Sequence, residues 1–109
     1  MYRIPKDVSF SFLLGSTITE VREFEHNYIV LKLDPHREIH VEGGRRVEGW
    51  IAEDVPATVA GLVGRRIEAV TVASETELVV TVSGDIRFRM FDDSDQYECI
   101  HIYPEAIII

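Results

Sequence analysis

Apolar and polar residues alternate along much of the chain, and this alternation indicates the elements that the sequence predicts. The pattern is clearest in the segments 28–33 and 78–82, where every second residue is Ile, Leu or Val. A period of two is typical of a β-strand that buries one face. Turn-forming residues follow both segments, Asp34-Pro35 in the first case and Ser83-Gly84-Asp85 in the second. Proline fixes φ, glycine accepts positive φ and aspartate bonds its own backbone, so each strand is expected to end in a turn.

These two segments belong to a longer pattern that occurs twice. An offset of 49 residues places Gly15 over Gly64 and keeps the apolar positions in phase without a gap. The paired apolar residues include Leu13 and Leu62, Ile18 and Ile67, Val21 and Val70, Ile29 and Leu78, Leu31 and Val80, and Leu33 and Val82. A strand must keep its phase to keep the same side chains buried. A third strand follows in each copy, at 37–42 and 86–91, so the sequence predicts an internal duplication of a three-stranded meander.

Each copy begins with the pattern Leu-x-Gly-x-x-Ile-x-x-Val. The glycine can form a tight turn, and the residues after it are rich in β-branched side chains, which favours a strand. The three-residue step from Ile18 to Val21 breaks strict alternation. We therefore expect a β-bulge or a sharp twist in this strand, with a short helical turn as the competing interpretation.

The residues between the two copies contain the single tryptophan and the best helix signal. Residues 43–46, two glycines followed by two arginines, are typical of a loop, and residues 47–51 are predicted to form a further short strand that carries Trp50. Asp54 could cap one or two helical turns that end before Gly64, because aspartate accepts hydrogen bonds from the first N–H groups of a helix. The sequence thus predicts one short helix between the copies.

The C-terminal part of the sequence is predicted to add one closing strand. Residues 97–103 look like a strand that stops at Pro104, which cannot donate to a strand ladder. The apolar tail at 106–109 contains three consecutive isoleucines, which would form an adhesive edge in water. We expect this tail to pair with a strand, to be buried or to contact a partner, and a homodimer is one form that such a contact would take.

Together these elements favour a mainly β fold. Short strands separated by turn signals roughly every 8 to 12 residues are typical of small barrels, rolls and sandwiches. We expect residues 1–109 to form a single domain with repeat units at about 12–44 and 61–93, in which two meanders pack across a shared core with one short helix between them. The predicted core comprises Ile18, Val21, Ile29, Leu31, Leu33, Ile67, Val70, Leu78, Val80 and Val82.

Composition and charge narrow the classes of function. Hydrophobic residues make up 46% of the 109 positions, and no apolar run approaches the roughly 20 residues that cross a bilayer. These features argue against a disordered chain and against a membrane protein. The N-terminal residues lack the layout of a secretory signal, so we expect a cytosolic protein. The net charge of -8 would repel a phosphate backbone, which makes nucleic acid a poor partner and a basic protein a better one.

Few residue patterns indicate chemistry. His36 and His40 flank a predicted strand in which four residues span about 13 Å, so we favour two solvent-facing histidines over a metal site. The single cysteine, Cys99, lies in a strand-like context that favours a small buried side chain. No arrangement of a nucleophile with a base is recognisable, and the two adjacent glycines are too short a pattern for a phosphate loop. We therefore expect no catalytic residue, metal or cofactor.

Two arginines alternate with apolar residues in the third strand of the second copy. Arg87 and Arg89 should project from the solvent face of that strand, because successive side chains of a strand point to opposite faces. Cross-strand ion pairs with Glu75 or Glu77 are the simplest role for them.

Three features of the chain occur together: the paired Leu-x-Gly-x-x-Ile units, the alternating segments 28–33 and 78–82, and the stretch Asp-Asp-Ser-Asp-Gln-Tyr-Glu-Cys-Ile at 92–100. In these features the chain resembles a family of small bacterial β proteins of unknown function. Members of that family tend to carry a Tyr-Glu pair before the final strand, as at Tyr97 and Glu98 here. Some proteins of this kind are thought to act as immunity proteins in toxin systems. The resemblance covers nearly the whole chain and implies neither enzyme activity nor a cofactor.

The acidic segment before the last strand is the candidate site. Calcium loops have a similar density of carboxylates, but this segment lacks their glycine at the turn and their bidentate glutamate at the twelfth position. A solvated acidic loop is the plain alternative, and a surface that recognises a cationic partner is the functional one. The candidate partner-binding residues are Asp92, Asp93, Asp95, Tyr97 and Glu98.

The sequence therefore favours a non-enzymatic binding module. Its most concrete form is an immunity protein that inhibits a bacterial toxin, or another basic protein, through an acidic surface. The alternative is a small-molecule-binding or regulatory β-barrel, which a polar-lined interior would favour.

Overall fold

The structure, a computed structural model, describes residues 4, 9–25, 27–92, 99–105 and 107–109. This part of the chain is mainly β, with antiparallel sheets and two single turns of 3-10 helix, so the predicted fold class is confirmed at this level. No sheet of the described strands closes on itself, so the barrel alternative is not confirmed. No helix within these ranges has the length and apolar character needed to cross a membrane.

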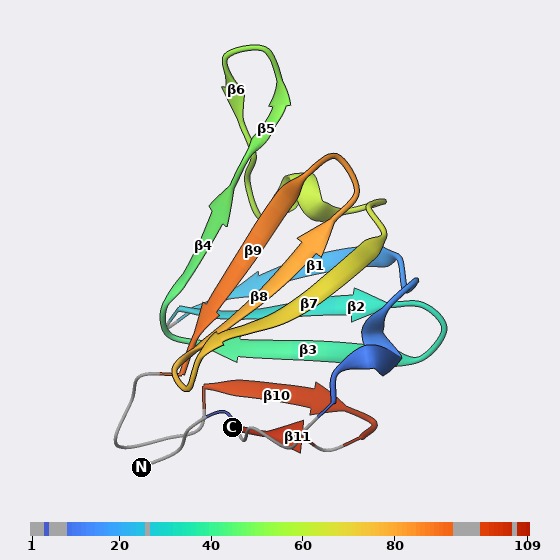
Figure 1. Ribbon diagram of the computed structural model, residues 1–109, viewed down its shortest axis with the longest axis vertical. Helices are drawn as coiled ribbons and strands as arrows, with labels where there is room; N and C mark the ends of the chain where they lie inside the picture. Colours follow the sequence, from blue (N-terminus) through green and yellow to red (C-terminus); the bar gives the residue numbers. More distant parts are fainter. Residues whose placement is uncertain (1–3, 5–8, 26, 93–98, 106) are drawn as a thin grey trace.

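Two larger sheets form the body of the molecule (Figure 1). The first sheet has the strand order β1-β2-β3-β10-β11, and the second has the order β4-β9-β8-β7. The strands of the first sheet are β1 (Ile18–Phe24), β2 (Tyr28–Leu33), β3 (Arg37–Glu42), β10 (Ile100–Tyr103) and β11 (Ile107–Ile108). Those of the second sheet are β4 (Arg45–Glu48), β7 (Ile67–Ser74), β8 (Glu77–Val82) and β9 (Ile86–Phe91). In Figure 1, β7, β8 and β9 lie in front of β1 and β2.

The two copies of the sequence pattern fold alike. Each forms an antiparallel meander, β1-β2-β3 or β7-β8-β9, and β2 and β8 have the same order of buried and half-buried residues. The expected bulge is present, because the pairing register shifts between Ile18 and Glu20 and, in the second copy, between Ile67 and Ala69. One turn of 3-10 helix precedes each meander, η1 (Ser11–Leu13) and η2 (Ala60–Leu62).

A local two-fold symmetry relates the copies where they meet. Thr17 and Arg66, which are equivalent positions of the two copies, form an isolated antiparallel bridge. Backbone hydrogen bonds around this bridge occur in matched pairs, which is what a two-fold axis requires. They run from Gly15 N to Ile67 O (2.9 Å) and from Gly64 N to Ile18 O (2.7 Å), and from Ile67 N to Ser16 O (2.8 Å) and from Ile18 N to Arg65 O (2.9 Å).

Each meander donates its next strand to the sheet of the other copy. Strand β4 follows β3 in the chain but pairs with β9, whereas β10 follows β9 but pairs with β3. The two pairings are equivalent, because Val47 lies opposite Phe88 in one sheet and Ile102 lies opposite Ile39 in the other. Both larger sheets therefore contain strands from both copies, which joins the two halves into one body.

The core lies between the two larger sheets and matches the predicted set. Eight of the ten predicted residues are buried to 3% exposure or less, and the other two, Val21 and Val70, are half-buried and pack against the same cluster. The equivalent residues Leu31 and Val80 are each 1% exposed. The prediction is confirmed because the alternation of a strand places every second side chain on one face.

The segment between the copies differs from what the sequence predicted. Asp54 does not cap a helix but has φ 62° in the turn of a hairpin formed by β5 (Trp50–Ala52) and β6 (Val55–Pro56). Aspartate tolerates this left-handed conformation because its short polar side chain bonds locally. The helix of the prediction is only the single turn η2, whose N-cap residue is Val59. Residues 45–46 lie in β4 rather than in a loop.

The C-terminal tail pairs with a strand, as expected. Strand β11 lies antiparallel to β10. Beyond it, Ile109 and Ile100 exchange two backbone hydrogen bonds of 2.9 Å each, and the Ile109 side chain is 4% exposed. Ile109 thus belongs to the core and Ile107 packs against it, whereas Ile108 in the edge strand β11 is 44% exposed.

Candidate binding site

The structure places only one of the predicted partner-binding residues, Asp92. Its side chain is 0% exposed, and its N–H donates to the carbonyl of Thr76 at 2.7 Å. This carboxylate therefore does not form part of an exposed acidic surface. Asp93, Asp95, Tyr97 and Glu98 lie outside the described residues, and their role stays a prediction.

The outer face of the first sheet carries a group of aromatic and polar side chains. The alternation that buries Ile29 on the inner face turns Tyr28 and Val30 of β2 to the outer face. On the neighbouring strand, Glu42 pairs with Tyr28 and His40 pairs with Val30. Register alone therefore brings these four residues together.

His40 lies at the centre of this group. Its Nε2 lies 2.9 Å from Oε1 of Glu38, its Nδ1 is hydrogen-bonded to the Tyr28 hydroxyl, and its ring meets that of Tyr103 edge to face at 5.1 Å. Glu38 can only accept when ionised, so Nε2–H donates to Glu38, and in the neutral imidazole Nδ1 then accepts from the Tyr28 hydroxyl. His36 is exposed, as expected, whereas His40 lies on the outer face of the sheet but is only 20% exposed because its neighbours cover much of its side chain.

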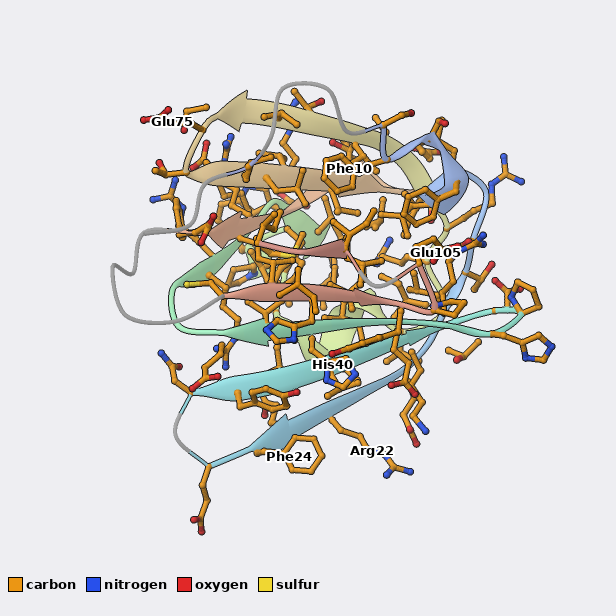
Figure 2. The ribbon with its side chains drawn as sticks, turned by 90° about the horizontal axis from the view of Figure 1, so that it is seen from below. Phe10, Arg22, Phe24, His40, Glu75 and Glu105 are labelled. Atoms are coloured by element: carbon orange, nitrogen blue, oxygen red, sulfur yellow. The ribbon has the colours of Figure 1, made fainter. Side chains whose placement is uncertain are left out.

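A shallow depression of about 470 Å³ opens beside His40. It is lined by Phe24, Glu25, Tyr28, Val30, His40 and Glu42. The rings of Phe24 and Tyr28 lie 5.9 Å apart at 62°, and Phe24 is 52% exposed. Figure 2 shows Phe24 at the edge strand and His40 further in over the sheet.

The depression has a negative electrostatic environment. Glu25 and Glu42 take part in none of the ion pairs formed by the described residues. Burial raises the pKa of the Tyr28 hydroxyl, and Tyr103, Glu42 and Glu38 raise this pKa further because they disfavour a phenolate. Tyr28 therefore stays a neutral hydrogen-bond donor rather than a nucleophile.

The second copy has different chemistry at the equivalent positions. Glu77 and Arg89 stand where the first copy has Tyr28 and His40. Arg89 binds Glu48 through Nε at 2.5 Å and Glu77 through Nη1 at 3.2 Å. These bonds confirm the ion pair expected between Arg89 and Glu77.

The charges of this second face are largely satisfied internally. The hydrogen bond with Glu48 raises the pKa of Arg89, and the same bond lowers the pKa of Glu48. Arg87 lies 3.9 Å from Asp85, so its expected pairing with Glu75 or Glu77 is not found. The two copies therefore share a core pattern but differ on their outer faces, and the depression lined by Phe24 and Tyr28 lies on the outer face of the first copy.

A second candidate surface is the hairpin β5–β6, which we call the arm. Figure 1 shows the arm projecting beyond the ends of the two larger sheets. All residues of its two strands are exposed, including Trp50 at 63%, Ile51 at 44% and Val55 at 42%. Its base is closed by a hydrogen bond of 2.9 Å from Ala57 N to Gly49 O.

Sequence reasoning missed both surfaces. The arm has no Asn-Gly or Asp-Gly turn, so its hairpin lacks the strongest short-range signal. The group around His40 depends on the pairing of β3 with β10, which brings Tyr103 to a strand that lies far from it in the sequence. One signal in the sequence could have indicated part of this group: the alternation of residues 28–33 places Tyr28 on the face of the strand that points away from the core.

No metal-binding group of side chains occurs among the described residues. These residues contain no group of three or more His, Cys, Asp and Glu side chains that could hold a metal ion, and Cys99 is buried. Comparison of the chain with protein-family models, curated proteins and solved structures found no match. The resemblance to small bacterial β proteins therefore stays an expectation, and function has to be argued from these two surfaces.

Proposed function

We propose that the chain is a non-enzymatic binding module that contacts a basic protein partner through the arm. The observation that supports this proposal is the exposure of Trp50, Ile51 and Val55 on one projecting hairpin. Exposed apolar side chains gathered in one place are typical of protein interfaces, and tryptophan is enriched among the residues that contribute most to binding.

The arm is preorganised for binding. Trp50 pairs with Pro56 and Ala52 pairs with Val55 across the hairpin, so its side chains project from a paired backbone. A rigid contact surface loses less conformational entropy on association than a flexible one. This geometry supports insertion of the Trp50 side chain into an apolar pocket of the partner.

Charge supports a basic partner. Glu53 and Asp54 at the tip of the arm are exposed, and neither forms an ion pair with a described residue. With a net charge of -8, the whole protein attracts cationic surfaces and speeds the encounter with them. Toxins that act on nucleic acid need such a surface, so inhibition of a toxin is the most concrete form of the proposed function.

Affinity capture followed by titration tests the proposal. Proteins retained by the wild type, together with the product of the adjacent gene, are identified and titrated at about 50 and 200 mM salt. We expect Trp50→Ala to weaken binding by about 30-fold or more, as at a central interface tryptophan. Phe24→Leu, which removes an exposed aromatic ring outside the arm, is the matched control and should bind like the wild type. Equal affinity of Trp50→Ala and the wild type for every retained basic protein would contradict the proposal.

The alternative function, small-molecule binding, has a different basis. No sheet of the described strands closes into a barrel, so an enclosed barrel interior does not support small-molecule binding. Its support is the depression on the outer face of the first sheet.

A further inference from the structure

We propose that the depression lined by Phe24, Glu25, Tyr28 and Glu42 binds an organic ammonium cation. This site is separate from the arm, and nothing in the proposed function requires it. Three observations support this inference. The rings of Phe24 and Tyr28 lie close together, Glu25 and Glu42 take part in no ion pair among the described residues, and the Tyr28 hydroxyl in the wall is already hydrogen-bonded.

The aromatic rings form part of a cage. A cation is attracted to the face of an aromatic ring by the ring quadrupole, and recognition sites for alkylated ammonium groups place several rings at an angle to one another. The rings of Phe24 and Tyr28 lie 5.9 Å apart at 62°. Phe24 is 52% exposed, so this ring is accessible to a ligand instead of being used in the core.

The carboxylates of Glu25 and Glu42 have no counter-charge among the described residues. Glu25 and Glu42 line the depression, and no ion pair among the described residues involves either of them. Arg45 forms no ion pair with either carboxylate: its Nη1 donates to the carbonyls of Asn27 and Gly43 at 2.8 and 3.2 Å. Burial lowers the pKa of Arg45, and the carboxylate that raises this pKa is Glu23. A bound cation would complete the pairing of these carboxylates.

The wall of the depression favours an ammonium group that needs few directional hydrogen bonds. The Tyr28 hydroxyl is already bonded to His40, and Val30, which also lines the depression, is apolar. An alkylated ammonium group carries its charge on an apolar surface and matches rings, an aliphatic side chain and unpaired carboxylates.

The second copy acts as an internal comparison. Its residues equivalent to Phe24, Tyr28 and Glu42 are Ala73, Glu77 and Phe91. It therefore lacks both the ring pair and the carboxylate of Glu42, and Glu77 is already bonded to Arg89. The site belongs to the first copy alone, although the core positions of the two copies match.

Titration with choline tests the proposal, with 3,3-dimethylbutan-1-ol as the ligand control because it has the same shape without the charge. Amide NMR signals of the wild type are followed at millimolar ligand. We expect choline to shift the signals of Phe24, Tyr28, Val30 and Glu42 with saturation, and the neutral alcohol to shift them weakly. Equal shifts with both ligands, or choline shifts elsewhere only, would overturn the proposal.

Single substitutions test the contributions of the Phe24 ring and of the Glu42 carboxylate to cation binding separately. Phe24→Leu and Glu42→Gln should each weaken choline binding about two- to fivefold, the range for one cation–π contact and for one ion pair at an exposed site. Trp50→Leu and Glu53→Gln make the same chemical changes on the arm and should leave choline affinity unchanged. Phe24 is on the surface, so its replacement leaves the core intact, and Glu42→Gln keeps the shape of the side chain. Wild-type affinity in both depression variants would overturn the proposal.

Two sources could supply such a cation, a free ammonium compound or a lysine side chain of a protein. The tripeptide acetyl-Gly-Lys-Gly-amide, with its lysine either unmodified or trimethylated, is titrated beside choline. Tighter binding of the trimethylated peptide than of choline would identify a protein side chain as the ligand. Tighter binding of choline would identify a free compound. Failure of all three cations to bind would overturn the proposal while leaving the function of the arm unaffected.

Discussion

At the scale of residues, the two copies place opposite chemistry on equivalent backbone positions. Tyr28 bonds to His40 in the first copy, whereas Glu77 bonds to Arg89 in the second. The second contact is an ion pair that also involves Glu48. The pKa of Tyr28 is raised and that of Glu48 is lowered, so the contributions of these two groups to stability should change with pH at the alkaline and the acid end respectively.

Tyr28 should lose its proton at a higher pH than an ordinary tyrosine. Burial and the neighbouring acidic groups raise its pKa above 10.0. The folded state thus holds this proton more tightly than the unfolded chain, so the stabilisation is complete below the unfolded pKa and is lost as pH rises through the folded pKa. Absorbance at 295 nm measured from pH 8 to pH 13 should show a late component that Tyr28→Phe removes. A titration curve of the same shape in both proteins would contradict this prediction.

Glu48 should contribute to the free energy of unfolding at neutral pH and lose this contribution at acid pH. Its hydrogen bond with Arg89 lowers the pKa of the carboxyl below 4.5, so the stabilisation is present above the unfolded pKa and is lost as pH falls through the folded pKa. Glu48→Gln should therefore be less stable than the wild type at pH 7, and this difference should shrink at pH 3, as measured by urea unfolding. Glu53→Gln, an exposed residue outside the described ion pairs, should show little difference at either pH. A difference for Glu48→Gln that is independent of pH would count against this role.

At the scale of elements, each meander is preceded by the same turn. Gly15 and Gly64 have φ values of 86° and 87°, and no atom lies within 4 Å of a Cβ built on either residue. Two residues later, the backbone N–H of Thr17 donates to Asp34 Oδ1, and that of Arg66 donates to Ser83 Oγ. Asp34 in one copy and Ser83 in the other therefore accept the equivalent backbone hydrogen bond, so the turn is the same although the accepting residue differs.

Gly15→Ala and Gly64→Ala should destabilise the protein to the same extent. Each substitution forces an L-residue into the left-handed region at a cost of about 1 to 2 kcal/mol, and neither adds a steric clash. Gly61→Ala is the control, because this glycine does not have positive φ and its added Cβ would make only ordinary contacts of 3.5 and 3.6 Å. Urea unfolding would show shifts for the first two variants and little loss for the third. A clear inequality between Gly15→Ala and Gly64→Ala would contradict the equivalence of the turns.

Local elements could be predicted from the sequence because their signal is local. The strand 28–33 and the third strands 37–42 and 86–91 occur at the predicted bounds, since alternation and turn residues define them. The arm could not be predicted, because Asp54 is a good residue both for a helix cap and for a left-handed turn. In the structure Asp54 takes the left-handed conformation, in the turn between β5 and β6.

The candidate site was less accessible to sequence reasoning. Density of charge singled out Asp92, whose side chain is buried, since composition does not show which way a side chain points. Phe24 and His40 sit on different strands, and their proximity depends on the register of β1, β2 and β3. Alternation predicts the face of each residue, but the neighbours across the sheet follow only from the pairing.

At the scale of the whole molecule, the exchange of β4 and β10 makes each larger sheet depend on both copies. Each meander lies in one sheet, but the strand that follows it, β4 or β10, pairs in the other sheet. Unfolding of one meander together with the strand that follows it therefore removes strands from both sheets, so the two copies are expected to unfold together. A single cooperative transition is expected for such a small body with one shared core.

Leu31→Ala and Val80→Ala test this coupling, because the two residues are equivalent and each is 1% exposed. Each substitution should cost about 2 to 4 kcal/mol through lost burial and the cavity that remains. In urea, amide NMR signals from both larger sheets should disappear at a common midpoint in each variant. Loss of one sheet at lower urea than the other would show that the copies unfold independently. A cost below about 0.5 kcal/mol would contradict the core assignment.

The exchange of strands also sets the order in which the protein can be completed during synthesis. Strand β3 ends at Glu42, but its neighbour β10 begins at Ile100, so about 60 further residues must be made before the first sheet is whole. At roughly 5 to 20 residues per second, the nascent chain carries an open strand edge for several seconds. Such an edge can pair with a strand from another chain. Adjacent ribosomes on one messenger RNA would hold identical open edges close together. The longer β3 waits for β10 of its own chain, the more time it has to pair with a strand of a neighbouring chain instead.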